Sequence, residues 1–129
     1  MIEEEIYFEM LEAENFVRLE PIELIQYDSV LDWDRSWIST TVKINGGKFS
    51  GRYVAEFMTV DFEKFKQEVS KLYDNLAGTA YFTDLEGYLE LKVLGDGIGH
   101  FTVAVSACDR PGADGSELTF SFGFDQTQI

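Results

Sequence analysis

The chain has 129 residues, of which 24 are acidic and 10 are basic, and its formal net charge is −14 at pH 7. This length fits a single domain over residues 1–129, and an apolar fraction of 45% is enough for a buried core, which excludes a disordered chain. Because affinity for phosphate groups comes largely from Lys and Arg, the charge argues against nucleic acids and anionic membranes as partners.

Acidic residues are concentrated near the N-terminus. Residues 1–35 contain eleven acidic and two basic residues, whereas residues 36–129 contain thirteen acidic and eight basic ones. A solvated, exposed segment explains this distribution, and so does an electronegative surface that attracts a basic partner. The residues alone leave both interpretations open.

Alternation of apolar and polar residues predicts β-strands before residue 60. Residues 17–20 alternate in this way, and Pro21 then shifts the phase, which indicates an edge strand or a bulge. The alternation returns over residues 38–44 and again over residues 49–57. Between them, Asn-Gly-Gly-Lys at residues 45–48 is typical of a hairpin turn, because glycines adopt the positive φ angles of tight turns.

One stretch, at about residues 62–76, changes to the periodicity of a helix. Its apolar residues form a single stripe at helical spacing: Phe62, Phe65, Val69, Leu72 and Leu76. Asp61 is a suitable N-cap, and Val60 and Phe65 occupy the two positions of a hydrophobic staple. Gly78 follows the last turn as a stop signal, so both ends of the helix are predicted.

After the helix the alternation resumes over residues 80–93. Gly-Asp-Gly at residues 95–97 predicts a hairpin into residues 101–107, and a loop of turn-forming residues at 109–116 leads to a last strand over residues 118–124. Strands on both sides of one helix, without βαβ alternation, predict an α+β fold. We expect a single curved antiparallel β-sheet meander of about seven strands, with the one amphipathic helix packed on its apolar face.

The residues that most often carry catalysis or metal binding are scarce. His100 is the single histidine and alternates with Thr102 on the polar side of its strand, so we interpret it as a half-exposed strand residue. Cys108 is the single cysteine, and neither a Cys nor a His stands at the spacing of a zinc site, which favours a small buried hydrophobe. We therefore expect no catalytic residue, no metal and no cofactor.

Two patterns imitate ligand-binding loops. Gly-Asp-Gly-Ile-Gly at residues 95–99 resembles a phosphate loop, but it lacks the Lys and the following helix that such loops use, so a hairpin turn is favoured. Asp28, Asp32 and Asp34 depart from the alternating spacing of a calcium loop, and the turn glycine of that loop is missing.

Residues 27–37 place two tryptophans among three aspartates. In one interpretation Trp37 enters the core and Trp33 covers a sheet edge. In the other, an exposed loop anchors a protein partner, because aromatic residues carry a large share of interface energy. The candidate partner-binding residues are Asp28, Asp32, Trp33 and Asp34.

A second candidate surface is a hydroxyl-rich outer sheet face. Its residues are Ser39, Thr41, Thr102, Ser106, Thr119 and Ser121. One side of an antiparallel sheet normally faces water, so this face needs no function to explain it.

The sequence also indicates a compartment. The lone Cys108 has no partner for an internal disulfide, and the start Met-Ile-Glu-Glu-Glu has neither the basic nor the apolar region of a signal peptide. No window approaches the roughly 18 apolar residues that a membrane span requires. We therefore expect a soluble protein of the cytoplasm.

Several short motifs carry a family resemblance. They are Trp37-Ile38, Phe49-Ser-Gly-x-Tyr-x-Ala, Asp61-Phe-x-x-Phe, Leu76-x-Gly-x-Ala-x-Phe82, Leu89-x-Leu91, Gly99-His100, Leu118-Thr-Phe-x-Phe and Asp125-Gln-Thr127. In these motifs the chain resembles a bacterial family of small α+β proteins that includes WapI-type immunity proteins. The likeness covers about 90 of the 129 residues and leaves the acidic first quarter largely outside.

The resemblance implies a protein that neutralises the nuclease domain of a bacterial cell-wall toxin, and it carries over no catalytic residue. We therefore expect a non-enzymatic module that occludes a basic toxin domain. The alternative is a small-molecule-binding one-helix β protein with an aromatic-lined pocket. A cavity of roughly 300 Å³ or more with convergent polar groups would favour that alternative, whereas a filled Phe core would favour the interaction module. The oligomeric state stays open, a dimer included.

Overall fold

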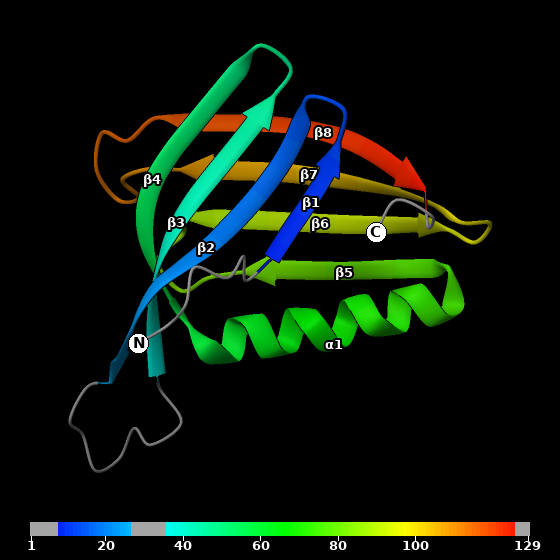
Figure 1. Cartoon of the computed structure of the whole chain (residues 1–129), viewed down its shortest axis with the longest axis horizontal. Coiled ribbons are helices and arrows are strands. Elements are labelled where there is room, and N and C mark those ends of the chain that lie inside the picture. The colour runs from blue at the N-terminus through cyan, green and yellow to red at the C-terminus, as the bar shows by residue number, and fades with distance from the viewer. Residues whose placement is uncertain (1–7, 27–35, 126–129) are drawn as a thin grey trace.

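The computed structural model describes residues 8–26 and 36–125, which form eight strands and one helix (Figure 1). In chain order the elements are β1 (Phe8–Glu12), β2 (Asn15–Gln26), β3 (Ser36–Gly46), β4 (Phe49–Met58), α1 (Thr59–Asn75), β5 (Ala77–Thr83), β6 (Leu89–Asp96), β7 (His100–Cys108) and β8 (Glu117–Asp125). The predicted α+β class with antiparallel strands is confirmed.

The strands form two sheets of four, so the predicted single meander of about seven strands is wrong. The first sheet has the order β1-β2-β3-β4 and the second has the order β5-β6-β7-β8. Helix α1 connects β4 to β5, and its 17 residues, at 1.5 Å of rise each, carry the chain about 25 Å from the end of the first sheet. The chain then turns back along the helix and starts a new sheet.

The register of the first sheet explains two features of the sequence. The β2–β3 ladder shifts between Pro21 and Glu23, so the predicted bulge is confirmed. The described pairs of β1 with β2 end at Leu19, before Pro21. The predicted hairpin at residues 45–48 is confirmed, since Gly46 pairs with Phe49 and Gly47 has a φ of 63°. The β1–β2 turn uses a non-glycine residue at positive φ, Ala13.

Helix α1 begins and ends earlier than predicted. Met58 is the N-cap, and its N–H donates to Asp61 Oδ2 over 3.2 Å, so Asp61 acts from the third helical position. Leu76, with a φ of 62°, takes the left-handed conformation that ends the helix, and its N–H donates to the Leu72 carbonyl over 2.7 Å. The residue that ends the helix, Leu76, therefore lies two positions before the predicted Gly78.

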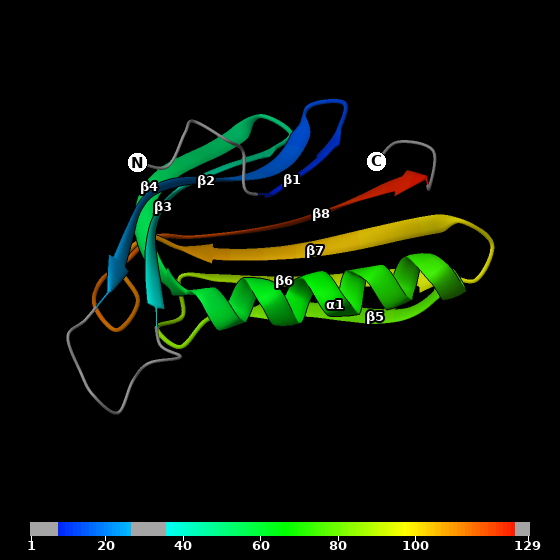
Figure 2. The ribbon, with the colours of Figure 1, turned by 60° about the horizontal axis from the view of Figure 1, so that its bottom comes forward.

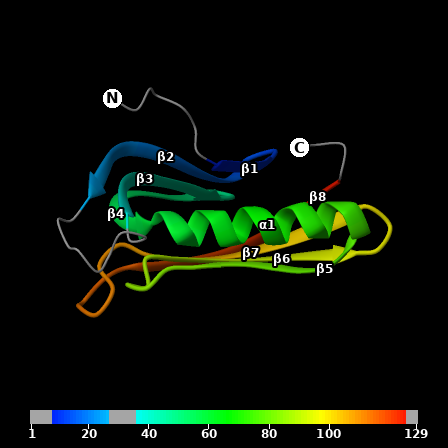
Figure 3. The same ribbon diagram turned by 90° about the horizontal axis from the view of Figure 1, so that it is seen from below.

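The two sheets pack face to face around an aromatic core. Strands of the first sheet run obliquely across those of the second, and α1 lies along β5 (Figures 1 and 2). Viewed from below, the helix lies along the side of the molecule between the two sheets (Figure 3). The Phe57 ring is fully buried, and its centroid lies 5.7 Å from that of Phe62 and 5.4 Å from that of Phe82.

The predicted apolar stripe of α1 faces this core. Phe62, Phe65 and Leu72 are buried, whereas Val69 and Leu76 are half-buried against the same cluster. The stripe meets both sheets, because Phe62 contacts the rings of Phe57 and Phe82. The helix thus covers the core between the two sheets along the side where β5 lies.

Candidate partner-binding surfaces

The four residues predicted to bind a partner lie outside the described residues: Asp28, Asp32, Trp33 and Asp34. The structure does describe the two ends of their segment. Gln26 at the end of β2 pairs with Ser36 at the start of β3, so residues 27–35 connect two adjacent strands. Trp37, which one interpretation placed in the core, is half-buried on β3.

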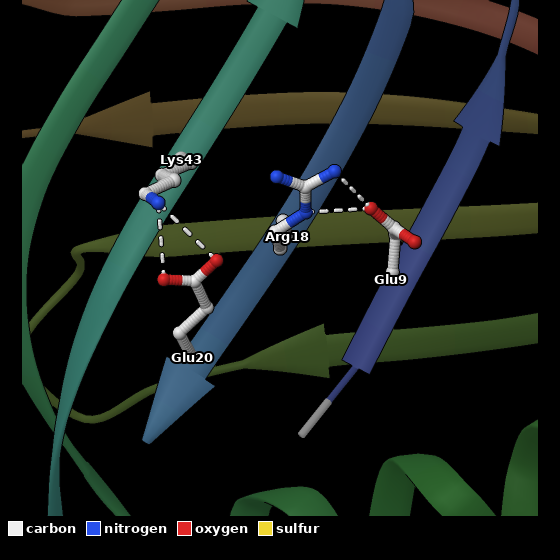
Figure 4. A network of polar contacts seen from close by, with 4 residues as sticks. All are labelled: Glu9, Arg18, Glu20 and Lys43. Carbon is white, nitrogen blue, oxygen red and sulfur yellow. Dashed lines mark hydrogen bonds and ion pairs between the residues drawn. The ribbon is translucent and has the colours of Figure 1, made fainter. Parts of the chain in front are cut away.

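Ion pairs cross the outer face of the first sheet. The Arg18 side chain of β2 bonds Glu9 of β1 through Nε and Nη2, each 2.6 Å from Oε2 (Figure 4). Lys43 of β3 binds both carboxylate oxygens of Glu20 of β2, with Nζ at 3.1 Å and 3.2 Å (Figure 4). Partly exposed pairs of this kind contribute about 0–1 kcal/mol to stability, but they neutralise two glutamates of the acidic first quarter.

The hydroxyl-rich face predicted as one surface is divided between the two sheets. Ser39 and Thr41 lie on β3 in the first sheet, whereas the other four residues lie on β7 and β8 in the second: Thr102, Ser106, Thr119 and Ser121. On the second sheet, Ser106 pairs directly with Thr119. The predicted single hydroxyl-rich face is therefore wrong, and its larger part lies on the neighbouring strands β7 and β8.

The turn between β6 and β7 holds the single histidine. The Asp96 carboxylate accepts the N–H groups of Ile98 at 2.9 Å and His100 at 3.1 Å, and these bonds lower the pKa of Asp96. The His100 ring is 66% exposed and lies 3.9 Å from Asp96 and 3.7 Å from Asp125. The glycine-rich segment is thus a hairpin turn, as predicted, with Gly97 at a φ of 92°.

The opposite end of the second sheet surrounds Cys108. This half-buried thiol borders a small pocket of about 180 Å³ between the β5–β6 loop and the start of β8. Nearby, Tyr53 Oη donates to the Tyr88 carbonyl over 2.6 Å, and burial followed by the charge of Asp84 raises the pKa of the Tyr53 phenol. The Asp84 carboxylate accepts three backbone N–H groups of the loop, at residues 87, 88 and 89.

A larger groove of about 370 Å³ lies where β1, α1 and β8 meet. Its lining is mostly apolar: Phe8, Glu9, Met10, Leu11, Val69, Tyr73 and Phe124. The Tyr73 hydroxyl is covered and has no hydrogen-bond partner among residues 8–26 and 36–125, and burial raises its pKa. The sequence analysis offered an aromatic-lined pocket as an alternative but did not place this groove, because its walls come from three elements that are far apart in the chain.

Two further observations on the described residues concern metal binding and membrane-spanning helices. In residues 8–26 and 36–125, no three side chains of the types His, Cys, Asp and Glu gather to hold a metal ion. No helix within the same ranges is long and apolar enough to cross a membrane. The side chains that these surfaces present are suited to contacts with another molecule through charge, hydroxyl groups and apolar area.

The sequence model of one family, described as the immunity protein WapI-like family, matches residues 10–129. The chain belongs to this family. No curated protein and no solved structure matches it.

Membership of the WapI-like family confirms the predicted resemblance and corrects its extent. The match begins at residue 10, so it includes seven of the eleven acidic residues of the first quarter, which the resemblance had placed largely outside. The acidic segment 27–35 therefore lies within the family match.

Proposed function

We propose that this WapI-like protein neutralises a cationic, nuclease-type bacterial toxin in the cytoplasm by binding it and covering its basic surface. The family match over residues 10–129 carries the proposal, and the net charge of −14 supports the nature of the partner. Neutralisation by occlusion needs no catalytic group on the immunity protein.

The charge suits this role in two ways. A nuclease binds its substrate through a basic surface, and an acidic protein competes with nucleic acid for that surface. The same negative potential accelerates the encounter of the two proteins. The pairs Glu9–Arg18 and Glu20–Lys43 each neutralise one acidic side chain, and the chain keeps a net charge of −14 after all its basic residues are counted.

Asp28, Asp32, Trp33 and Asp34 are our proposed contacts in the segment between β2 and β3. The Trp side chain would supply apolar contact area, and the three carboxylates would meet Lys or Arg side chains of the toxin. The direct pairing of Gln26 with Ser36 means that the segment starts and ends at neighbouring positions of the first sheet.

Co-expression with a toxin domain tests the proposal, and a toxin reading frame found beside this gene is the partner to use. We expect the wild-type protein to bind the toxin and to restore growth. A triple variant, Asp28→Asn, Asp32→Asn and Asp34→Asn, should weaken binding by about tenfold or more, since close charge pairs across an interface contribute strongly.

A matched triple variant controls for the change in net charge. Asp74→Asn, Glu86→Gln and Asp114→Asn also remove three negative charges, at exposed positions on α1 and in two loops. This variant should bind the toxin within about twofold of the wild type. If both triple variants lose the same amount of toxin affinity, the proposed contacts in residues 27–35 are wrong. If the wild type neither binds the toxin nor protects the cell, the protein does not neutralise that toxin.

The groove lined by Phe8, Tyr73 and Phe124 favours a second candidate function, small-molecule binding. Its volume of about 370 Å³ exceeds the roughly 300 Å³ that we expect of a ligand-binding cavity. However, its polar groups are few, and Glu9 is already paired with Arg18. The filled core around Phe57 and Phe82 favours the interaction module instead. Thermal-shift screening of a metabolite set would detect a ligand, and Tyr73→Phe should then reduce the shift.

A further inference from the structure

The open edges of the two sheets differ in how well they are protected. β1 and β4 are the edge strands of the first sheet, and β5 and β8 are those of the second. An edge strand presents backbone N–H and C=O groups that pair readily with another strand, and proteins usually protect such edges by charge, shortness, irregularity or a covering element.

Three of the four edges have such protection. Helix α1 packs along β5, and Glu68 Oε1 accepts the Tyr81 N–H over 2.7 Å, so the helix caps that edge directly. β1 is only five residues long and contains two glutamates. β4 carries Arg52 and Glu56 within its length, and these charges discourage the approach of another strand.

β8 has weaker protection, because its charged residues stand only at its two ends. It is nine residues long and pairs with β7 without a register shift, from His100–Asp125 to Cys108–Glu117. No Lys, Arg or Pro interrupts it, and Glu117 and Asp125 stand at its two ends. Within residues 8–26 and 36–125, its backbone bonds only to β7. In Figure 1 it borders the second sheet on the side opposite α1.

The two terminal charges indicate what pairs with this edge. In an antiparallel β8–β8 dimer centred on Ser121, Glu117 of each copy would oppose Asp125 of the other, and like charges directly opposite each other destabilise a strand pair. A strand with Lys or Arg near each end would instead place opposite charges at both positions. The edge therefore disfavours a second copy of this chain and favours a basic strand.

We infer that β8 is the edge onto which the toxin adds an extended basic segment, so that the second sheet gains a fifth strand in the complex. This inference rests on the proposed function and names the partner's contact as a strand. Backbone hydrogen bonds would hold the segment along β8, and charge pairs at Glu117 and Asp125 would fix its register.

Substitution at the middle of the edge tests the inference, with the adjacent-gene toxin domain as the probe. Ser121→Lys places a positive charge on the outer face of β8, where it repels a basic strand, and should raise the Kd for the toxin about tenfold or more. Val54→Lys is the matched control, because Val54 is 56% exposed on the edge strand β4. It should change the Kd by no more than about twofold.

Amide hydrogen exchange gives a readout that depends on strand pairing. In the complex, every second amide from Leu118 to Phe124 should exchange more slowly, because only alternate N–H groups of a strand face its open edge. Circular dichroism and the thermal midpoint check that Ser121→Lys folds. Thr119→Lys replaces it if it does not.

The outcomes separate the two proposals. If the toxin binds but the β8 and β4 variants bind it equally well, or the β8 amides are unchanged, strand addition is wrong and toxin neutralisation stands. If the wild type neither binds nor protects, toxin neutralisation fails and strand addition fails with it. A free protein that dimerises through β8, and that Ser121→Lys converts to a monomer, would overturn the choice of a basic partner.

Discussion

Tyr53 is the residue whose ionisation the fold changes most clearly. Its hydroxyl donates to the Tyr88 carbonyl, which also accepts the Cys108 N–H over 3.0 Å. Burial, and then the nearby charge of Asp84, raise the pKa of Tyr53 above its usual value of about 10. The native state therefore keeps its proton at a pH where the unfolded chain loses it.

This raised pKa predicts a loss of stability in alkali. A raised native pKa contributes stability that is complete below about pH 10 and is lost as the pH rises above it. Tyr53→Phe should cost about 1 kcal/mol at pH 7, because the Tyr88 carbonyl keeps its bond from Cys108. Urea unfolding measures the free energy of unfolding of the variant and of the wild type. The difference between the two free energies should become smaller above pH 10, and a difference that stays constant would contradict the raised pKa of Tyr53.

Single residues were predictable where a local pattern determines them. Alternation with Thr102 placed His100 on the polar side of β7, and the structure shows an exposed ring there. The Tyr53–Tyr88 bond joins β4 to the β5–β6 loop across 35 positions of the chain, and no local pattern signals such a pair. The predicted contacts at Asp28, Asp32 and Asp34 stay predictions, because they lie outside the described residues.

At the scale of elements, the end of α1 depends on a glycine in β6. A Cβ atom at Gly95 would lie 2.6 Å from the Leu76 carbonyl oxygen and 2.9 Å from Leu72 Cδ1. The same carbonyl accepts the Gly97 N–H over 2.7 Å. The absence of a side chain at Gly95 thus lets the last helical turn sit directly on the second sheet.

Gly95→Ala should therefore destabilise the protein by about 1–3 kcal/mol, because the helix end has to move away from β6. Gly51→Ala is the matched control on β4, where a Cβ would meet only the Ile44 side chain, at 3.3 Å. That side chain can move slightly, so the control should cost less than about 1 kcal/mol. Thermal unfolding of both variants measures the difference, and equal midpoints would contradict the packing argument.

Elements were predictable when their ends carried turn signals. Asn-Gly-Gly-Lys marked the β3–β4 hairpin, whereas the β1–β2 turn at Ala13 has no such residue and was missed. The helix was predicted from its stripe, although Asp61 caps it from inside the first turn. Alternation shows which residues of a strand face the core, but it does not show which strand is the neighbour, so the division into two sheets was missed.

At the scale of the whole molecule, the net charge of −14 predicts how the toxin is encountered. Attraction between exposed charges weakens as salt shortens the screening length, from about 14 Å at 0.05 M to about 4 Å at 0.5 M. The association rate with a basic toxin should fall steeply over this range, and the dissociation rate should change much less. Stopped-flow mixing at several salt concentrations measures both, and a salt-independent association rate would exclude electrostatic steering.

The order of the sheets also has a consequence for biosynthesis. Each described strand pairs only with strands adjacent to it in the chain, so little loop-closure entropy opposes the ladders, and folding should be fast for a β-rich protein. The first sheet has all its residues by Met58, before α1 and the second sheet leave the ribosome. The Phe57 ring then lacks its contact with Phe82 until β5 is synthesised, so the nascent first half exposes apolar surface that the second half later buries.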